Sequence, residues 1–359
     1  MTDRPTVLVT GGAGYIGSHC IRALPAAQYE VVVYDNLSTG HRTFVAEPLV
    51  VGDLIDETTL VQVFSRYKIA AVMHFAAASL VGESIVDPQK YYINNVGGTL
   101  ALLQAMRKAG CHRIVFSSSG AVYGNADSKG LPERFSCAPI NPYGVSKWMI
   151  ERMLADYRSA YGFGVFYLRY FNASGADPAG GIGEWRDNET HLIPRAMMAL
   201  QGHVSDFAVF GDDYDTPDGT AIRDYVHVTD LATAHVEALK LLLDGHSGGT
   251  FNLGTGSGYS VREILAAIKM ETGRDVPHIV KPRRQADPTY LVADTSAARK
   301  ILKFVPAYSD LSTIIRTAWT WHQKAHPRRR CAADTRAPMY SESLVKCQRA
   351  GTTPFMRAK

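Results

Sequence analysis

The chain has 359 residues, of which 46% are hydrophobic and 20% are charged. This composition is ordinary for a globular protein of one large or two modest domains. Because no apolar run reaches membrane-spanning length and the N-terminus lacks a signal peptide's charged start and cleavage site, we expect no membrane association and a cytoplasmic protein. The five cysteines are scattered and lack metal-ligand spacing, so we interpret them as reduced thiols and predict no metal site.

The net charge of +4 is concentrated at the C-terminus. Residues 327–359 contain eight Lys or Arg and two Asp or Glu, a net charge of +6, so the preceding residues carry 4 − 6 = −2. Nucleic-acid binding by the folded part therefore loses its support. Because residues 327–359 lack hydrophobic periodicity, we expect a basic, mostly disordered tail whose arginine run is a solvated charge cluster.

A glycine-rich turn follows the first predicted strand. Thr6 to Thr10 form a short β-branched run that predicts a buried strand, and a helical pattern extends from Ser18 to about Ala27. Strand, glycines and helix in this order predict a dinucleotide site, because glycines let a pyrophosphate approach the positive end of the helix. The glycine-rich turn reads Gly11-Gly12-Ala13-Gly14-Tyr15-Ile16-Gly17.

An acidic residue ends the second predicted strand, Glu30 to Tyr34. Asp35 stands about 20 residues after the glycines, where a carboxylate accepts hydrogen bonds from an adenosine ribose and repels a 2′-phosphate. This position favours NAD over NADP. Arg42 could hold a 2′-phosphate, but it lies beyond the expected position, and the plainer alternative for Asp35-Asn36 is a turn.

Strands and helices alternate through the first half of the chain. This alternation predicts an α/β fold with a Rossmann-type, doubly wound parallel sheet. Two strands end in small or polar residues, Ala76 to Ala78 and Ser117 to Gly120, at the edge where such sheets bind ligands. The further strands are expected at 50–54, 70–75, 113–116 and 164–170, and helices at 56–68, 88–109 and 146–161.

Tyr143 and Lys147 stand four residues apart at the start of a predicted helix. Positions i and i+4 share one helix face, so the phenol and the ammonium point the same way. A neighbouring cation favours the phenolate, and a tyrosine of lowered pKa can accept a proton from a sugar hydroxyl. The alternative is a surface lysine beside a buried aromatic ring.

The pattern changes after Asn172. Residues 173–190 are rich in Gly, Asp, Asn and Pro and predict a long, functional loop. We predict an NAD-binding domain at 1–172 and a smaller α/β substrate-binding domain at 173–326, some of whose segments return to the sheet. The later strands are expected at 206–210 and 250–253, and helices at 191–201, 230–243, 261–272, 295–302 and 309–325.

Six motifs, in this order, closely resemble those of the extended short-chain dehydrogenase/reductase family over about residues 5–325. Within the family the chain is most similar to the members that epimerise UDP-sugars. The motifs are Gly11 to Gly17, His74-Phe75-Ala76-Ala77, Ser117-Ser118-Ser119, Tyr143 to Lys147, Arg169-Tyr170-Phe171-Asn172 and Arg223-Asp224-Tyr225-Val226-His227-Val228.

The resemblance implies interconversion of UDP-glucose and UDP-galactose, in galactose metabolism, through a transient 4-keto sugar and tightly bound NAD⁺. Tyr143 would take the proton of the 4-hydroxyl while hydride passes from C4 to NAD⁺. Ser119 would hydrogen-bond the 4-oxygen and relay the proton, and Lys147 would lower the Tyr143 pKa and bind the nicotinamide ribose. The implied cofactor-binding positions are Gly11, Gly14, Tyr15, Ile16, Gly17, Asp35, Asn36, Asp53, Leu54, Phe75, Ala76, Ala77, Asn94, Ser117, Tyr143, Lys147 and Tyr170.

The resemblance also implies a UDP-sugar site and a homodimer formed through helices at about 90–109 and 145–162. Arg223 and Arg284 would bind the diphosphate together with Asn172, although Arg223 could instead form a local salt bridge to Asp224. Asp287 would bind the uridine ribose. The other implied substrate-binding positions are His191 and Leu192 near the uracil, Phe210, Tyr225, Ser119 and Tyr143 lining the site, and Leu291 beside the sugar.

Two departures from the family pattern matter. Ser79 replaces a lysine that reaches the cofactor phosphates in some relatives, and Leu291 stands where a bulky tyrosine accompanies strict UDP-hexose specificity. We therefore predict weaker activity on N-acetylated UDP-sugars, whose epimerisation is the alternative function. A related dehydratase or decarboxylase would need an acidic residue where this chain has Gly120 and Ala121, and an inactive NAD-binding scaffold would not need the intact tyrosine–lysine pair.

Overall fold

The structure is a computed structural model that describes residues 4–126, 128–284 and 287–325. These residues belong to one compact unit. The predicted basic tail at 327–359 lies outside the described residues. Among those described, no helix combines the length and the apolar character needed to cross a membrane.

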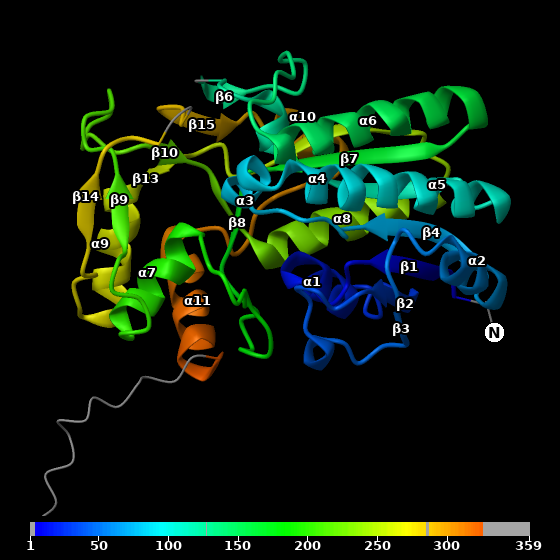
Figure 1. The fold of residues 1–359 in the computed structure, drawn as a ribbon, viewed down its shortest axis with the longest axis horizontal. Coiled ribbons are helices and arrows are strands. Elements are labelled where there is room, and N and C mark those ends of the chain that lie inside the picture. Colours follow the sequence, from blue (N-terminus) through cyan, green and yellow to red (C-terminus); the bar gives the residue numbers. More distant parts are fainter. Residues whose placement is uncertain (1–3, 127, 285–286, 326–359) are drawn as a thin grey trace, which may run out of the picture. The chain divides into compact units, whose positions relative to one another are not determined.

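A seven-stranded sheet, with six strands from residues 6–170 and one from residues 248–253, organises the molecule (Figure 1). All neighbouring strands pair in parallel, in the order β12-β7-β5-β4-β1-β2-β3. The chain adds strands outward from β1, then returns to place β4 beside β1, so the strand order reverses there and the predicted doubly wound fold is confirmed. The strands are β1 (Thr6–Thr10), β2 (Glu30–Asp35), β3 (Leu49–Val51), β4 (Ile69–His74), β5 (Arg113–Ser119), β7 (Gly164–Tyr170) and β12 (Gly248–Leu253).

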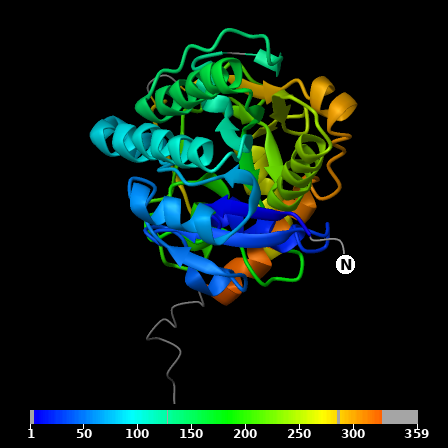
Figure 2. The same cartoon turned by 90° about the vertical axis from the view of Figure 1, so that its right-hand side faces the viewer.

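Separate apolar cores cover the two faces of this sheet. Along β1, Val7 and Val9 pack into one core with α1, α8 and α10, whereas Leu8 packs into the other with α2, α5 and α6. Side chains alternate across a strand, so a sheet covered on both faces needs continuous apolar runs of this kind. Figure 2 shows α5 and α6 next to each other. The helices are α1 (Tyr15–Ala23), α2 (Glu57–Arg66), α5 (Gly98–Lys108), α6 (Pro142–Tyr161), α8 (Val228–Leu243) and α10 (Ser296–Ile301).

The single helix predicted at 88–109 is interrupted. Pro88 begins a short α4 (Pro88–Tyr91), capped by Asp87, and a π-helical segment, Tyr92–Gly97, separates α4 from α5. The buried Asn95 side chain binds groups outside the helix, and the adjacent glycines Gly97 and Gly98 have low helix propensity. A short α3 (Val81–Val86) precedes α4, and two 3₁₀ turns occur at Arg42–Phe44 and Gly120–Tyr123.

The remaining strands of the described residues form three smaller sheets, with the orders β13-β10-β15-β6, β11-β8 and β14-β9. A third apolar core joins α7, α9 and α11. Several of these strands have only two to four residues, too few for hydrophobic periodicity to reveal. The boundary at residue 172 stays a prediction, although β12 and α8 do pack on the main sheet. The elements are β6 (Ser128–Leu131), β8 (Asn172–Ser174), α7 (Leu192–Leu200), β9 (Ala208–Phe210), β10 (Ile222–Arg223), β11 (Tyr225–His227), β13 (Tyr259–Ser260), α9 (Val261–Thr272), β14 (Ile279–Lys281), β15 (Tyr290–Ala293) and α11 (Leu311–Ala325).

Candidate active site

Most of the residues predicted for the cofactor lie at the carboxyl ends of the parallel strands or directly after them. The glycine turn follows β1, Asp35 ends β2, Phe75 follows β4, Ser117 lies near the end of β5, and Tyr170 ends β7. In an open parallel sheet this edge, beside the point where the strand order reverses, is where ligands bind.

The glycine turn fits a dinucleotide pyrophosphate. Gly11 has a φ of +72°, and a Cβ there would lie 2.5 Å from the Ala76 nitrogen, while a Cβ on Gly17 would lie 2.3 Å from the Gly11 oxygen. Only glycine tolerates these contacts. Gly14 precedes α1 and has no side chain to cap it, so the first N–H groups of α1 can serve an anion.

Asp35 fixes the glycine turn and also remains an acceptor for a ribose. Its carboxylate accepts hydrogen bonds from the backbone N–H groups of Ala13 (2.9 Å) and Leu37 (2.8 Å). Burial raises the pKa of Asp35, whereas these two hydrogen bonds oppose that rise. A carboxylate has about four acceptor positions, so two hydrogen bonds leave room for a diol. The neighbouring Asn36 side chain donates to Asp53 (2.8 Å).

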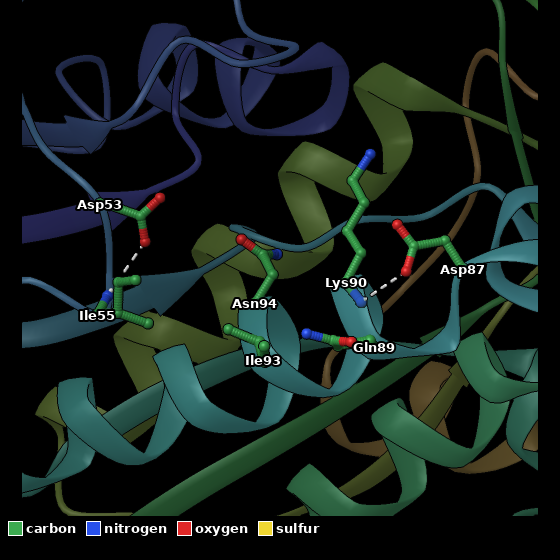
Figure 3. A pocket seen from close by; sticks show the side chains of 7 residues that line it. All are labelled: Asp53, Ile55, Asp87, Gln89, Lys90, Ile93 and Asn94. Carbon is green, nitrogen blue, oxygen red and sulfur yellow. Dashed lines mark hydrogen bonds between the residues drawn. The ribbon is translucent and has the colours of Figure 1, made fainter.

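A cavity of about 410 Å³ opens beside these residues (Figure 3). It lies between the segment after β3 and the segment from Asp87 to the π-helical turn. Asp53 and Asn94, both predicted to contact the cofactor, belong to its lining. Its position agrees with the adenosine end predicted for a dinucleotide, whose contact with these residues stays a prediction. The complete lining is Asp53, Ile55, Asp87, Gln89, Lys90, Ile93 and Asn94.

Tyr143 lies in the first turn of α6, which begins at Pro142, four residues before the start that we expected. Pro142 occupies the first helical position, and the Asn141 side chain caps the helix by accepting from Gly144 N (2.8 Å). The buried Tyr143 phenol therefore lies near a positive helix end. Burial raises the pKa of Tyr143, while a hydrogen bond with Ser119 opposes that rise.

Lys147 lies one turn further along α6 and is 3% exposed. Its ammonium donates to the Ser117 carbonyl (2.8 Å) and lies 6.0 Å from the centre of the Tyr143 ring. Burial lowers the pKa of Lys147 to about 7, and Glu151 opposes this effect. The predicted pair and Ser119 are thus gathered at one place, but the charge of Lys147 is sensitive to pH near neutrality.

A buried ion pair that we did not predict holds α6 against the sheet. Glu151 is 4% exposed and accepts hydrogen bonds from both sides of the Arg169 guanidinium and from Ser118 (2.6 Å). Bidentate pairing of this kind fixes geometry. The four-residue spacing of Lys147 and Glu151 indicates that they share one face of α6. No signal in the sequence indicates that Arg169 on β7 pairs with Glu151.

Asn95, which we did not predict to have a role, connects the cofactor segment to α6. Its side chain accepts from Ala78 N (2.8 Å) and donates to Ala78 O (3.0 Å) and Ser146 Oγ (2.9 Å). Asn94 lines the cavity instead, so its contact with cofactor stays a prediction. The π-helical turn shifts which side of the helix each asparagine faces, and regular helical spacing does not reveal that shift.

Five predicted substrate-binding residues also lie close together. Arg223 pairs with Asp287, and the Arg284 guanidinium lies 4.0 Å from the centre of the Phe210 ring. Strand pairing places Leu291 beside Arg223. The alternative of a local Arg223–Asp224 salt bridge does not hold, because the Asp224 carboxylate accepts from Thr255, Gly256 and Ala293.

The remaining predicted substrate positions are anchored differently. The side chain of Asn172 donates to the Asp224 carbonyl (3.1 Å), and Asn172 pairs with Tyr225 between β8 and β11. His191 and Leu192 begin α7, and His191 Nδ1 lies 2.7 Å from Glu184 Oε1 and 3.3 Å from Glu189 Oε1. The His191 ring is engaged by these carboxylates, and its contact with uracil stays a prediction.

Comparison with known proteins places this arrangement in a family. Residues 7–254 match the NAD dependent epimerase/dehydratase family. A UDP-glucose 4-epimerase of Rhizobium leguminosarum bv. trifolii is 50% identical over 322 residues, covering 89% of this chain and 98% of that protein.

Solved structures of similar fold belong to the same kind of enzyme. The crystal structure of UDP-glucose 4-epimerase from Brucella ovis in complex with NAD has a TM-score of 0.86 and 53% identity, covering 88% of this chain and 97% of that one. The enzyme from Bifidobacterium longum in complex with NAD⁺ and UDP has a TM-score of 0.85 and 37% identity, covering 90% and 99%. The resemblance found in the sequence is confirmed, and the chain belongs to the NAD-dependent epimerase/dehydratase family.

Proposed function

We propose that the protein is an NAD-dependent isomerase that interconverts UDP-glucose and UDP-galactose by inverting C4 through a transient 4-keto sugar. The observation that carries this proposal is the meeting of Tyr143, Ser119 and Lys147 at the carboxyl edge of the sheet. The glycine turn and Asp35 at the same edge fit NAD. The relatives that share this architecture include UDP-glucose 4-epimerases.

Different residues of the chain have different roles in the reaction. When bound, NAD⁺ supplies the oxidant for C4 and is regenerated in each cycle. Tyr143 removes the proton from the sugar 4-hydroxyl and later returns it, with Ser119 holding the 4-oxygen. Lys147 orients the nicotinamide ribose, and Arg223 and Arg284 bind the diphosphate through planar guanidinium groups.

One incubation tests this function. The protein as purified, supplied with UDP-galactose alone, should produce UDP-glucose without added cofactor, because NAD stays bound. Denatured protein should release NAD. An absence of conversion, even with NAD⁺ supplied, would reject the proposed function.

The acceptance of N-acetylated UDP-sugars is the alternative function. Leu291 lies next to Arg223 across β10 and β15, so its side chain belongs to the substrate side of the molecule. Because leucine is smaller than tyrosine, we expect weaker, measurable turnover of UDP-N-acetylgalactosamine. Leu291→Tyr should lower, and Leu291→Cys should raise, the kcat/KM ratio of this sugar to UDP-galactose. Equal ratios in all three proteins would mean that Leu291 does not select the sugar.

We also infer a homodimer formed through the segment around α5 and through α6. Leu100 on α5 and Met149 on α6 are each 40% exposed. Exposed apolar side chains on adjacent helices favour a protein partner. Sedimentation should give the mass of two chains, and Leu100→Glu with Met149→Glu should give one. A wild-type monomer would reject the dimer.

We infer a cytoplasmic location from the cysteines. Cys20, Cys111 and Cys137 are free thiols in the described part of the chain, and the first two are buried. Such thiols suit a reducing compartment.

A further inference from the structure

Arg186 bridges the long loop before α7 and the cofactor side of the molecule. Its Nε donates to Glu184 Oε1 (3.0 Å), and its Nη1 donates to Ser79 Oγ (3.4 Å). Glu184 and Arg186 belong to the loop predicted at 173–190, whereas Ser79 follows β4. The Arg186 side chain is only 21% exposed. A largely enclosed cation therefore joins two segments that are 107 residues apart in sequence.

The neighbours of Ser79 lead directly to Tyr143. Ala78 is held by Asn95, whose side chain donates to Ser146 Oγ, and Ser146 donates to the Tyr143 carbonyl (2.7 Å). On the other side, Leu80 N donates to the Tyr91 hydroxyl (2.9 Å). The Tyr91 ring packs edge-on against the Tyr143 ring, with 6.4 Å between the ring centres. The anchor of Arg186 is thus fixed to the surroundings of the reactive phenol on both sides.

The acidic partner of Arg186 is shared with a second cation. Glu184 Oε1 also pairs with His191 Nδ1, at 2.7 Å. Burial alone would lower the pKa of His191, but Glu184 and Glu189 outweigh it and raise this pKa to about 10. His191 is therefore charged at neutral pH. With Glu184 and Glu189 set against His191 and Arg186, the four groups sum to zero, and Arg186 is the member that reaches the cofactor side.

We propose that Arg186 is a positioning residue of the reaction centre, whose permanent positive charge acts through the Tyr143 phenol and favours its ionised form. The proposal rests on the proposed function, because it needs Tyr143 as the base. It also follows from the chemistry of the two cations near this phenol. Lys147 has a pKa of about 7 and is only partly charged at neutral pH. An arginine side chain stays charged throughout the working range.

The surroundings of Tyr143 contain few other groups that could substitute for Arg186. Burial raises the pKa of Tyr143, whereas the Ser119 hydrogen bond and the Arg186 charge oppose that rise. The neighbouring phenols of Tyr91 and Tyr170 stay neutral, because burial raises the pKa of each. The titratable and charged groups facing Tyr143 in the described structure are Lys147 on α6, Tyr91 on α4, Tyr170 on β7 and Arg186 on the loop.

The test compares Arg186→Gln with Arg186→Lys and with a control, Arg22→Gln. Arg22 pairs with Asp177 of the same loop (2.8 Å), so its loss removes a loop anchor without removing the charge near Tyr143. The first measurement is the pH dependence of kcat/KM with UDP-galactose. A charge at short range and partial exposure is expected to move a pKa by about one unit. The kcat/KM should rise with pH as Tyr143 loses its proton. Arg186→Gln should therefore move this rising limb of the pH profile to higher pH by about one unit, which lowers kcat/KM about tenfold at a fixed pH on the limb.

Rescue and a direct titration complete the test. Arg186→Lys should keep the wild-type limb, and Arg22→Gln should not move it. The Tyr143 phenol is also titrated directly by NMR in protein with ¹³Cζ-labelled tyrosine, with Tyr143→Phe identifying its signal. Arg186→Gln should raise that phenol pKa in this measurement as well.

Three results with Arg186→Gln would overturn the proposal. They are a rising limb of the kcat/KM profile at the wild-type pH, an equal loss of kcat/KM at every pH, and an unchanged pKa of the Tyr143 phenol. If wild-type protein does not convert UDP-galactose, the proposed function fails. The phenol titration still decides whether Arg186 acts on Tyr143.

Discussion

The cofactor side and the substrate side of the molecule are built in different ways. On the cofactor side, the glycine turn follows β1 of the seven-stranded sheet, α6 packs against β5 and β7, and the Glu151–Arg169 pair that supports α6 is 4–5% exposed. On the substrate side, Arg223 and Asp287 belong to a two-residue strand and a loop, and they are 14% and 29% exposed. The ion pair on the cofactor side is thus enclosed by packing, whereas the Arg223–Asp287 pair on the substrate side lies nearer to solvent.

The substrate-side pair has a consequence for binding. The resemblance assigns Arg223 to the diphosphate and Asp287 to the ribose, yet here they pair with each other. A UDP-sugar must share or replace that contact, so part of its binding free energy is offset by the loss of the pair. On the cofactor side, the polar contacts of Asp35 and Asn95 are made to backbone groups and neighbouring side chains and need no such exchange. The two sides should therefore respond differently to mutation.

The largest effect should come from the reactive phenol. Tyr143→Phe keeps the ring that packs against Tyr91 but removes the base. We expect kcat to fall about 10²- to 10⁴-fold, with bound NAD and the melting temperature almost unchanged. The measurements are turnover of UDP-galactose, cofactor content and thermal unfolding. Near-normal turnover would show that Tyr143 is not the base.

The next effect tests how tightly the cofactor side is packed. Gly11 and Gly110 have nearly equal positive φ values, +72° and +69°, but only Gly11 faces a backbone atom that a Cβ would strike. Each Gly→Ala change should cost about 1 kcal/mol of unfolding free energy from strain. Gly11→Ala should cost about 2 to 3 kcal/mol more through overpacking and should lose NAD. Equal costs in denaturant titrations would mean that the glycine turn relaxes easily.

A smaller and more local effect is expected on the substrate side. Arg223→Gln should weaken UDP binding about 10- to 100-fold, because it removes a charged hydrogen-bond donor. The melting temperature and the NAD content should hardly change. Arg283→Gln is the control, since Arg283 pairs with Asp213 (2.7 Å) at a 41% exposed position. Calorimetric titration with UDP measures both. Loss of NAD from Arg223→Gln would contradict the separation of the two sides.

The same difference explains what could be predicted from the sequence. Runs such as Thr6 to Thr10 repeat with glycines and small residues at their ends, so the sheet and the position of these residues at its carboxyl edge were predicted correctly, whereas their roles stay predictions. The helix at 88–109 was wrong in its middle, because Asn95 makes contacts with Ala78 that helical periodicity does not encode. The Arg186–Ser79 contact was also missed. It joins segments 107 residues apart, and only the folded chain brings them together.

The smallest effect concerns the ion pair at the start of α7, and it depends on pH. Glu184 and Glu189 raise the pKa of His191 from 6.5 to about 10, against the opposing effect of burial. A pKa that is higher in the folded chain stabilises that chain fully below pH 6.5, and the stabilisation is lost as the pH rises toward 10. Because the His191 side chain is 45% exposed, water screens the pair and we expect only about 1 kcal/mol. The unfolding free energy of wild type should therefore exceed that of His191→Gln by this amount at pH 6, by less at pH 8.5, and not at all at pH 10.5. His112→Gln is the control, since the His112 ring stacks on Phe163. A wild-type advantage over His191→Gln that stays constant from pH 6 to pH 10.5 would mean that His191 stabilises the fold by packing alone.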